Sequence, residues 1–78
     1  MILSVCYRGR SVAVPVLLER GLLIADVAHR AAWLLDAGLG PWTLQRALFP
    51  IPYDEEVCEA LGDGAICDLI PVPKEVRA

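Results

Sequence analysis

A proline interrupts the most strand-like segment of the sequence, VAVPVLL at residues 12–18. Alternating β-branched and apolar residues favour a β-strand, but proline lacks the backbone N–H that a sheet ladder uses, so it is confined to edge strands. Pro15 lies on the opposite face from Val12, Val14 and Val16. The pattern therefore predicts a strand at the edge of a sheet, where the proline also discourages pairing with other chains.

The residues before this segment predict a partner strand. Residues 2–7 alternate between a face that carries Leu3 and Val5 and a more polar face. The sequence RGRS at residues 8–11 has the glycine and polar residues of a turn. We therefore expect an amino-terminal β-hairpin.

From about Leu23 the spacing of the apolar residues changes to that of a helix. Gly21 is the only residue near its start that resembles a cap, and Gly38 suits the left-handed position that ends many helices, with Leu39 making the apolar contact beyond it. Trp33 lies roughly 140° from the centre of the apolar stripe at about 100° per residue, so we expect it to be partly exposed. The stripe consists of Ile24, Val27, Ala28, Ala31, Leu34 and Leu35.

The carboxy-terminal half predicts two more strands. Residues 42–48 alternate and indicate a strand, and residues 49–53 form a stiff connection because they contain two prolines. Asp54 is a good N-cap for a helical turn that runs to Leu61. A Gly-Asp-Gly turn then leads into a last strand at residues 65–72.

The order of these elements predicts one α+β domain over residues 1–73, followed by a short polar tail at residues 74–78. A right-handed crossover from the hairpin through the helix places the last strand beside the first and parallel to it. The expected architecture is a mixed four- to five-stranded sheet packed on one α-helix.

Composition excludes several classes of function. The net charge of −3 and the scattered arginines argue against nucleic acid as a partner. No apolar run is long enough to span a membrane, and the amino terminus does not resemble a signal peptide. The three cysteines have no CxxC spacing, so we expect no metal, and reduced thiols favour a cytoplasmic protein.

Candidate catalytic residues are few. His29 is the only histidine, and a pair between His29 and Cys58 would be a coincidence of folding. The glycines at residues 38–40 and 62–64 lack the spacing of phosphate-binding loops. We therefore expect neither an enzyme nor a cofactor.

The layout resembles the ubiquitin-like β-grasp family over nearly the whole chain. The similar features are the RGRS turn, the helix with Ile24, Val27, Ala31 and Leu34 inward, the LQRALF strand after GPW, and the ALGDGAICDLIPV ending. Conjugated members and sulfur carriers end in Gly-Gly, whereas this sequence ends PVPKEVRA. The resemblance thus implies a non-conjugating bacterial type and disfavours a modifier or sulfur carrier.

Two groups of non-conjugating relatives fit this resemblance. The stretch VAHRAAWLLDAGLGP looks similar to the helix of small type VII secretion components and to that of small accessory subunits of diiron monooxygenases. Either implies an interaction or accessory module that binds another protein. A small homodimeric structural protein is the third alternative, and we expect a monomer or weak homodimer.

The candidate partner-binding surface is the sheet face away from the helix, which is the usual docking surface of ubiquitin-like domains. With Cys67 and Leu69 inward, Ile66, Asp68 and Ile70 point outward. A register shifted by one residue reverses this assignment, and both remain open on sequence alone. Trp33 is a second docking candidate, and Arg46 is the fifth partner-binding residue predicted.

Overall fold

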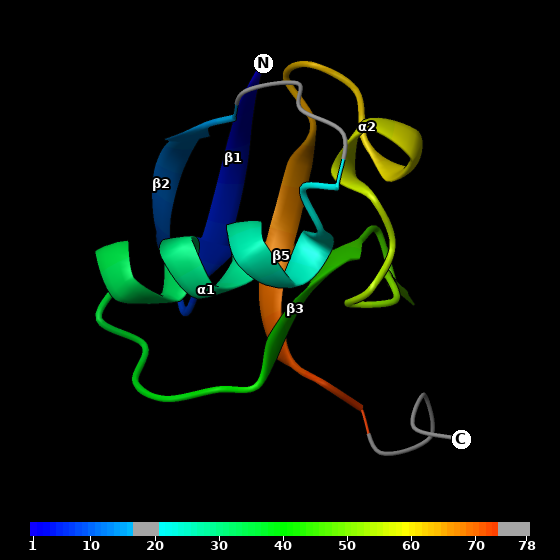
Figure 1. Cartoon of the computed structure of the whole chain (residues 1–78). Coiled ribbons are helices and arrows are strands. Elements are labelled where there is room, and N and C mark those ends of the chain that lie inside the picture. Colours follow the sequence, from blue (N-terminus) through cyan, green and yellow to red (C-terminus); the bar gives the residue numbers. More distant parts are fainter. Residues whose placement is uncertain (17–20, 74–78) are drawn as a thin grey trace.

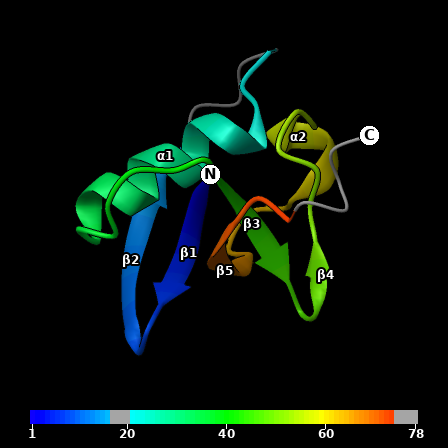
Figure 2. The same cartoon turned by 90° about the horizontal axis from the view of Figure 1, so that it is seen from below.

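The protein forms an α+β fold in a computed structural model that describes residues 1–16 and 21–73. A five-stranded mixed sheet has the order β2-β1-β5-β3-β4, and α1 crosses one face of it (Figures 1 and 2). Predictions for residues 17–18 and for the tail at 74–78 lie outside the described residues. The elements are β1 (Ile2–Tyr7), β2 (Arg10–Pro15), α1 (Ile24–Leu34), β3 (Trp42–Arg46), β4 (Phe49–Pro50), α2 (Val57–Ala60) and β5 (Ile66–Pro71).

The strand that carries Pro15 lies at an edge of the sheet, as predicted. Pro15 is opposite Ile2, and the adjoining Val16 donates its N–H to Met1 O at 2.7 Å. Bonded and non-bonded pairs alternate along an antiparallel ladder. Since Met1 and Val16 form a bonded pair, Ile2 and Pro15 form a non-bonded pair, and the nitrogen of Pro15 faces away from β1. The proline therefore removes no hydrogen bond from the hairpin.

The hairpin turn is shorter than the sequence predicted. Arg8 and Gly9 alone form it, with φ of 48° and 77°, and β2 already begins at Arg10. Two consecutive residues with positive φ are typical of the tight turn that matches the twist of paired strands. Arg8 occupies a left-handed conformation that a pattern of residue types does not single out.

The last strand lies between β1 and β3, as the crossover argument predicted. Ser4 on β1 is level with Ile66 on β5 in a parallel pair, and Leu44 on β3 faces Leu69 in an antiparallel pair. The central position explains why Cys67 and Leu69 are almost fully buried. The order of strands and helix is compatible with a β-grasp.

The start of α1 differs from the prediction. Leu23, not Gly21, is the N-cap residue, and its N–H donates to the Asp26 carboxylate at 2.9 Å. The N–H groups of Ile24 and Ala25 in the first turn donate to Glu55 O at 2.9 Å and Tyr53 O at 2.8 Å, and the Asp26 carboxylate suits the helix dipole.

The end of α1 comes earlier than predicted. Asp36, not Gly38, takes the first left-handed position, with φ of 54°, and Ala37 N–H donates to Ala32 O at 2.8 Å. Aspartate tolerates this conformation better than most residues, so no glycine is needed. Leu39 is completely exposed and makes no apolar contact, which corrects the prediction for it. Leu34 and Leu35 were both predicted to be inward, but Leu34 is 39% exposed and only Leu35 is buried.

The predicted strand at residues 42–48 is divided. β3 ends at Arg46, and a turn at Ala47 and Leu48 leads to the two-residue strand β4, which forms the second edge. Ala47 has φ of 52°, and Leu48 is 87% exposed. Phe49–Pro50 was predicted to be part of a stiff connection but pairs with β3, because two residues that include a proline show no strand pattern.

The second helix is also shorter than predicted. α2 contains four residues with Glu56 as its N-cap residue, so Asp54 does not cap it. The Glu56 carboxylate accepts a hydrogen bond from Gly21 N–H at 3.0 Å, and Val57 N–H donates to Leu22 O at 2.9 Å. These contacts attach α2 to the segment before α1.

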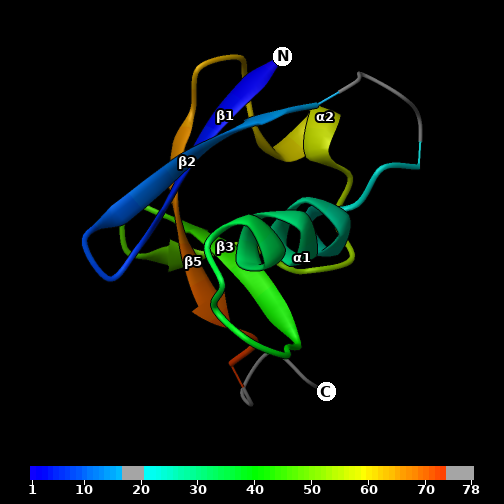
Figure 3. The same cartoon turned by 90° about the vertical axis from the view of Figure 1, so that its left-hand side faces the viewer.

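The core lies between α1 and one face of the sheet. Its fully buried centre contains Leu3, Val5 and Val14 from the hairpin, Ile24 from α1 and Leu44 from β3. Each fully buried aliphatic side chain contributes about 1.5–3 kcal/mol. The opposite sheet face has no described helix over it (Figure 3).

Candidate functional site

The outward residues of β5 lie on the open face of the sheet, as the preferred register predicted. Ile66 is 68% exposed and Asp68 is exposed, whereas Cys67 and Leu69 are 1% and 4% exposed on the helix side. The alternative with a one-residue shift is therefore wrong. Ile70 is only partly exposed, and its neighbour Thr43 on β3 is buried, with its hydroxyl donating to Ile51 O at 2.6 Å.

Ile66 belongs to an apolar patch that crosses three strands. Its neighbour on β1 is Ser4, and Ile2, two residues earlier on the same face, is 55% exposed. Across β1, Ala13 is opposite Ser4 and Pro15 is opposite Ile2. We call Ile2, Ala13, Pro15 and Ile66 the open-face patch. Of this set the sequence predicts only Ile66, because Ile2 joins it through the β1–β5 register and Pro15 through the hairpin register.

The Asp68 carboxylate lies on the same face of the sheet as this patch. Asp68 is level with Cys6 on β1 and faces Gln45 on β3, so neutral residues flank it on both neighbouring strands. The open face thus combines exposed aliphatic side chains with the negative charge of Asp68.

The structure does not bring Arg46 to this face. Arg46 is two residues beyond Leu44 on β3 and so shares the helix side of the sheet, at its exposed end. It lies in a cleft beside Phe49 with Glu55 and Glu59. Arg46, predicted as a partner-binding residue, lies on the opposite side of the sheet from Ile66 and Asp68, because the alternation along β3 places it on the same side as Leu44.

Trp33 is 80% exposed on α1, as expected, and lies away from the open face. It lines a pocket of about 380 Å³ at the carboxy-terminal end of the helix. We call this the helix-end pocket. The sequence does not predict this pocket, because the loop from Gly38 to Trp42 folds back against α1 in a way that no local pattern encodes. The lining residues are His29, Ala32, Trp33, Asp36, Gly38, Leu39, Gly40 and Trp42.

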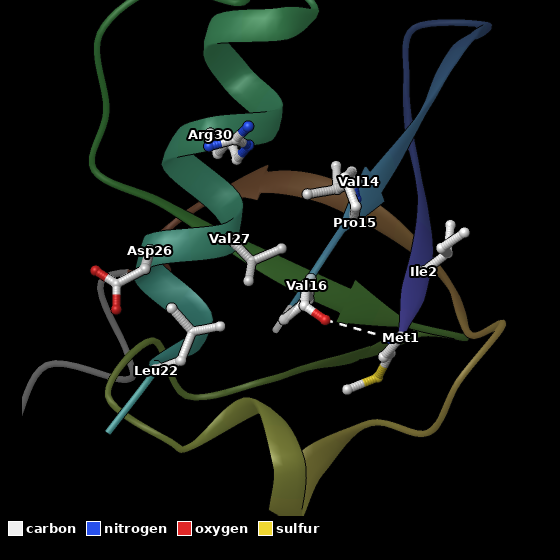
Figure 4. A pocket seen from close by; sticks show the side chains of 9 residues that line it. All are labelled: Met1, Ile2, Val14, Pro15, Val16, Leu22, Asp26, Val27 and Arg30. Carbon is white, nitrogen blue, oxygen red and sulfur yellow. Dashed lines mark hydrogen bonds between the residues drawn. The ribbon is translucent and has the colours of Figure 1, made fainter. Parts of the chain in front are cut away.

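A larger cleft of about 630 Å³ lies between α1 and the end of the hairpin. Figure 4 shows Val27 projecting from α1 toward Val16, with Asp26 and Arg30 on the same helix. Val16 and Leu22 line this cleft and flank residues 17–20, which are outside the described part of the chain. We therefore assign no ligand to it.

The cysteines Cys58 and Cys67 and the histidine His29 lie in separate surroundings. Burial raises the pKa of the Cys67 thiol, an effect that the positive charge of Arg46 partly opposes. Cys58 is exposed, with its sulfur 4.0 Å from the Glu56 carboxylate. The ring Nδ1 of His29 is 2.7 Å from Ala25 O. His29 and Cys58 therefore have different hydrogen-bond partners.

Two further properties concern only residues 1–16 and 21–73. Their histidine, cysteine and acidic side chains form no group of three or more placed to hold a metal ion. None of their helices has the length and hydrophobicity to cross a membrane.

The comparisons with known proteins identify no relative. A scan against protein-family models finds no match, and neither curated proteins nor solved structures match the chain significantly.

Proposed function

We propose that this protein is a non-catalytic, ubiquitin-like interaction or accessory module that binds another protein through the open face of its sheet. The element order supports this proposal, because a hairpin, a helix and a central parallel last strand are compatible with a β-grasp. The proposal takes two forms. The module would act either like the small component of a type VII secretion system or like the small accessory subunit of a diiron monooxygenase. Three cysteines present as thiols in the structure support a cytoplasmic setting.

The open-face patch is the observation that carries the proposal. Ile66 and Ile2 are diagonal neighbours on adjacent strands and are more than half exposed. Burying one such isoleucine against a partner gains about 1.5–3 kcal/mol. Pro15 and Ala13 extend the apolar area to the edge of the sheet. Asp68 adds a charge that orients a partner with a basic residue next to its apolar contact.

Replacement of Ile66 by aspartate tests this proposal. Ile66→Asp introduces a charge into the patch at an exposed position, so we expect partner binding to be lost while the free energy of unfolding changes by about 1 kcal/mol or less. Leu48→Asp is the matched control, because Leu48 is 87% exposed in the β3–β4 turn and outside the patch. Ile70 is a poorer choice, since it is half-buried opposite Thr43.

The measurement is affinity capture from the native host with the three proteins as bait, followed by titration of each purified candidate. A protein that binds the wild type and Leu48→Asp in the micromolar range or better, but not Ile66→Asp, supports the proposal. Equal binding by all three proteins contradicts it. If Ile66→Asp does not fold, Ile2→Asp replaces it. Association of the chain with itself through the patch would instead support the homodimeric alternative.

A further inference from the structure

The helix-end pocket has walls from two parts of the chain. His29, Trp33 and Asp36 come from the end of α1 and the residues after it, and the opposite wall is the loop that leads to β3 (Figure 1). All lining residues are within the described part of the chain. A pocket of about 380 Å³ has room for one large side chain of a partner.

The loop wall is fixed in place. The indole N–H of Trp42 donates to Gly38 O at 3.1 Å, and the Trp42 ring packs edge-on against Tyr7 with 5.6 Å between ring centroids. A Cβ on Gly40 would lie 2.7 Å from Trp42 Cδ1 and 3.0 Å from His29 Nε2. Only glycine permits the loop to approach both side chains this closely, so the pocket is built by specific contacts.

The charge of the pocket favours a cation. Asp36 is the only aspartate, glutamate, lysine or arginine in the lining. It also follows the carboxy-terminal end of α1, where the helix dipole is negative. A cation already binds this end of the helix, since the Arg10 guanidinium donates to Leu35 O at 3.2 Å. Arg10 is not among the residues that line the pocket, and Asp36 is exposed.

The exposed side chains of the pocket favour a guanidinium over an ammonium group. Trp33 presents an indole that is 80% exposed, and Leu39 beside it is completely exposed. A guanidinium stacks on an indole face and can donate two hydrogen bonds to one carboxylate, whereas an ammonium is a compact and strongly hydrated charge. An aliphatic stem would lie against Leu39.

We propose that the helix-end pocket binds an arginine side chain of a partner protein, with the guanidinium stacked on Trp33 and bonded to Asp36. This surface lies on the helix side of the sheet and does not depend on the open-face patch. A partner that contacts both surfaces would reach around the edge of the sheet, and two partners could bind at the same time.

An NMR titration of the ¹⁵N-labelled protein tests this inference. The probes are capped tripeptides Gly-Arg-Gly, Gly-Lys-Gly and Gly-citrulline-Gly, where citrulline is the neutral analogue of arginine. We expect the arginine peptide to shift the Trp33 indole N–H and the amide signals of residues 36–40 with a Kd on the order of 1–10 mM. The citrulline peptide should leave these signals unchanged.

Variants of Asp36 and Trp33 test separately the two contacts proposed for the arginine side chain. Asp36→Asn keeps a residue that tolerates the left-handed conformation and removes the charge, so we expect binding to weaken by about threefold or more. Trp33→Leu should weaken it similarly through loss of stacking. Asp54→Asn, which removes an exposed acid outside the pocket, should have no effect.

Several outcomes would overturn the proposal. They are equal shifts from the citrulline peptide, unchanged binding by Asp36→Asn, and shifts concentrated on the acids around α2. A lysine peptide that binds as well as arginine would contradict stacking on Trp33. Dimerisation in solution that Asp36→Asn abolishes would identify a second copy of the chain as the occupant. Loss of partner binding in Ile66→Asp tests only the open-face patch. The proposed function and the proposed arginine site can therefore fail independently of each other.

Discussion

The Asp63 carboxylate accepts a hydrogen bond from the backbone N–H of Ile2 at 2.8 Å, although the two residues are 61 positions apart. The adjoining Gly64 N–H donates to Ile2 O at 2.9 Å, and Ser4 N–H donates to Ala65 O at 2.9 Å. Together these bonds fix the start of β1 against the start of β5. They therefore set the relative position of Ile2 and Ile66 in the open-face patch.

Asp63→Ala should lower the free energy of unfolding by about 0.5–1.5 kcal/mol, because it leaves the Ile2 N–H without its protein acceptor. Asp63→Asn retains a carbonyl acceptor and should cost less. Asp54→Ala removes an exposed acid in the preceding connection and serves as the control for the loss of one negative charge. Urea unfolding of the four proteins measures the differences, and equal losses in Asp63→Ala and Asp54→Ala would show that this bond contributes nothing.

The parts of the fold that the sequence predicted are those with a strong local constraint. Pro15 required an edge, and the alternation around Cys67 favoured one face of β5. The parallel central position of β5 followed from the right-handed crossover. The features that local patterns did not predict depend on unusual backbone conformations. Examples are the turns at Asp36 and Ala47, where φ is positive.

The candidate site was predictable only in part, because surfaces combine residues distant in sequence. Ile66 was identified from its own strand, but Ile2 and Pro15 join it through pairing registers. Arg46 lies on the helix side of the sheet, because it is two residues beyond the buried Leu44 on β3. The helix-end pocket depends on the close approach of Gly40 to Trp42, which is a tertiary contact.

Pro15→Thr should increase self-association without a large effect on folding. The new N–H would point to the open edge of β2, since Pro15 lies opposite Ile2 in a non-bonded pair. The edge could then accept another strand, so we expect association at high concentration in sedimentation velocity experiments. The free energy of unfolding should fall by about 1 kcal/mol or less, through the greater freedom of the unfolded chain.

Val12→Pro is the contrasting variant for this edge. Val12 is opposite Val5 in a pair that, by the same alternation, bonds toward β1. A proline there should destabilise the protein by about 3 kcal/mol or more. Equal stability of Val12→Pro and wild type would mean that the Val12 N–H does not bond to β1. The assignment of bonded and non-bonded pairs along the hairpin would then be wrong.

Gly40→Ala should destabilise the protein by about 1–3 kcal/mol, as is typical of a side chain inserted where packing leaves no room. The added carbon would meet the backbone nitrogen of Trp42 at 2.7 Å, so the loop must move. Gly62→Ala is the matched control, because a Cβ at Gly62 meets nothing within 4 Å. Thermal unfolding by circular dichroism measures both, and equal melting temperatures for the two variants would contradict the tight loop packing.

Cys67 should make stability depend on pH above neutrality. Burial raises the pKa of its thiol above the ordinary value of 9.0, with Asp68 and Cys6 adding to the effect and Arg46 opposing it. The unfolded chain then releases the proton at a lower pH than the folded one, so stability is full below about pH 9 and falls as pH rises toward the folded pKa.

The loss cannot exceed about 1.4 kcal/mol per pH unit for one group. Cys67→Ala should be less stable at every pH because it leaves a cavity, but the difference between the two proteins should narrow from pH 8 to pH 10.5. Subtracting the two curves removes the contributions of tyrosines, lysine and the other thiols. A constant difference over this range would show that the Cys67 thiol ionises equally in the folded and unfolded states.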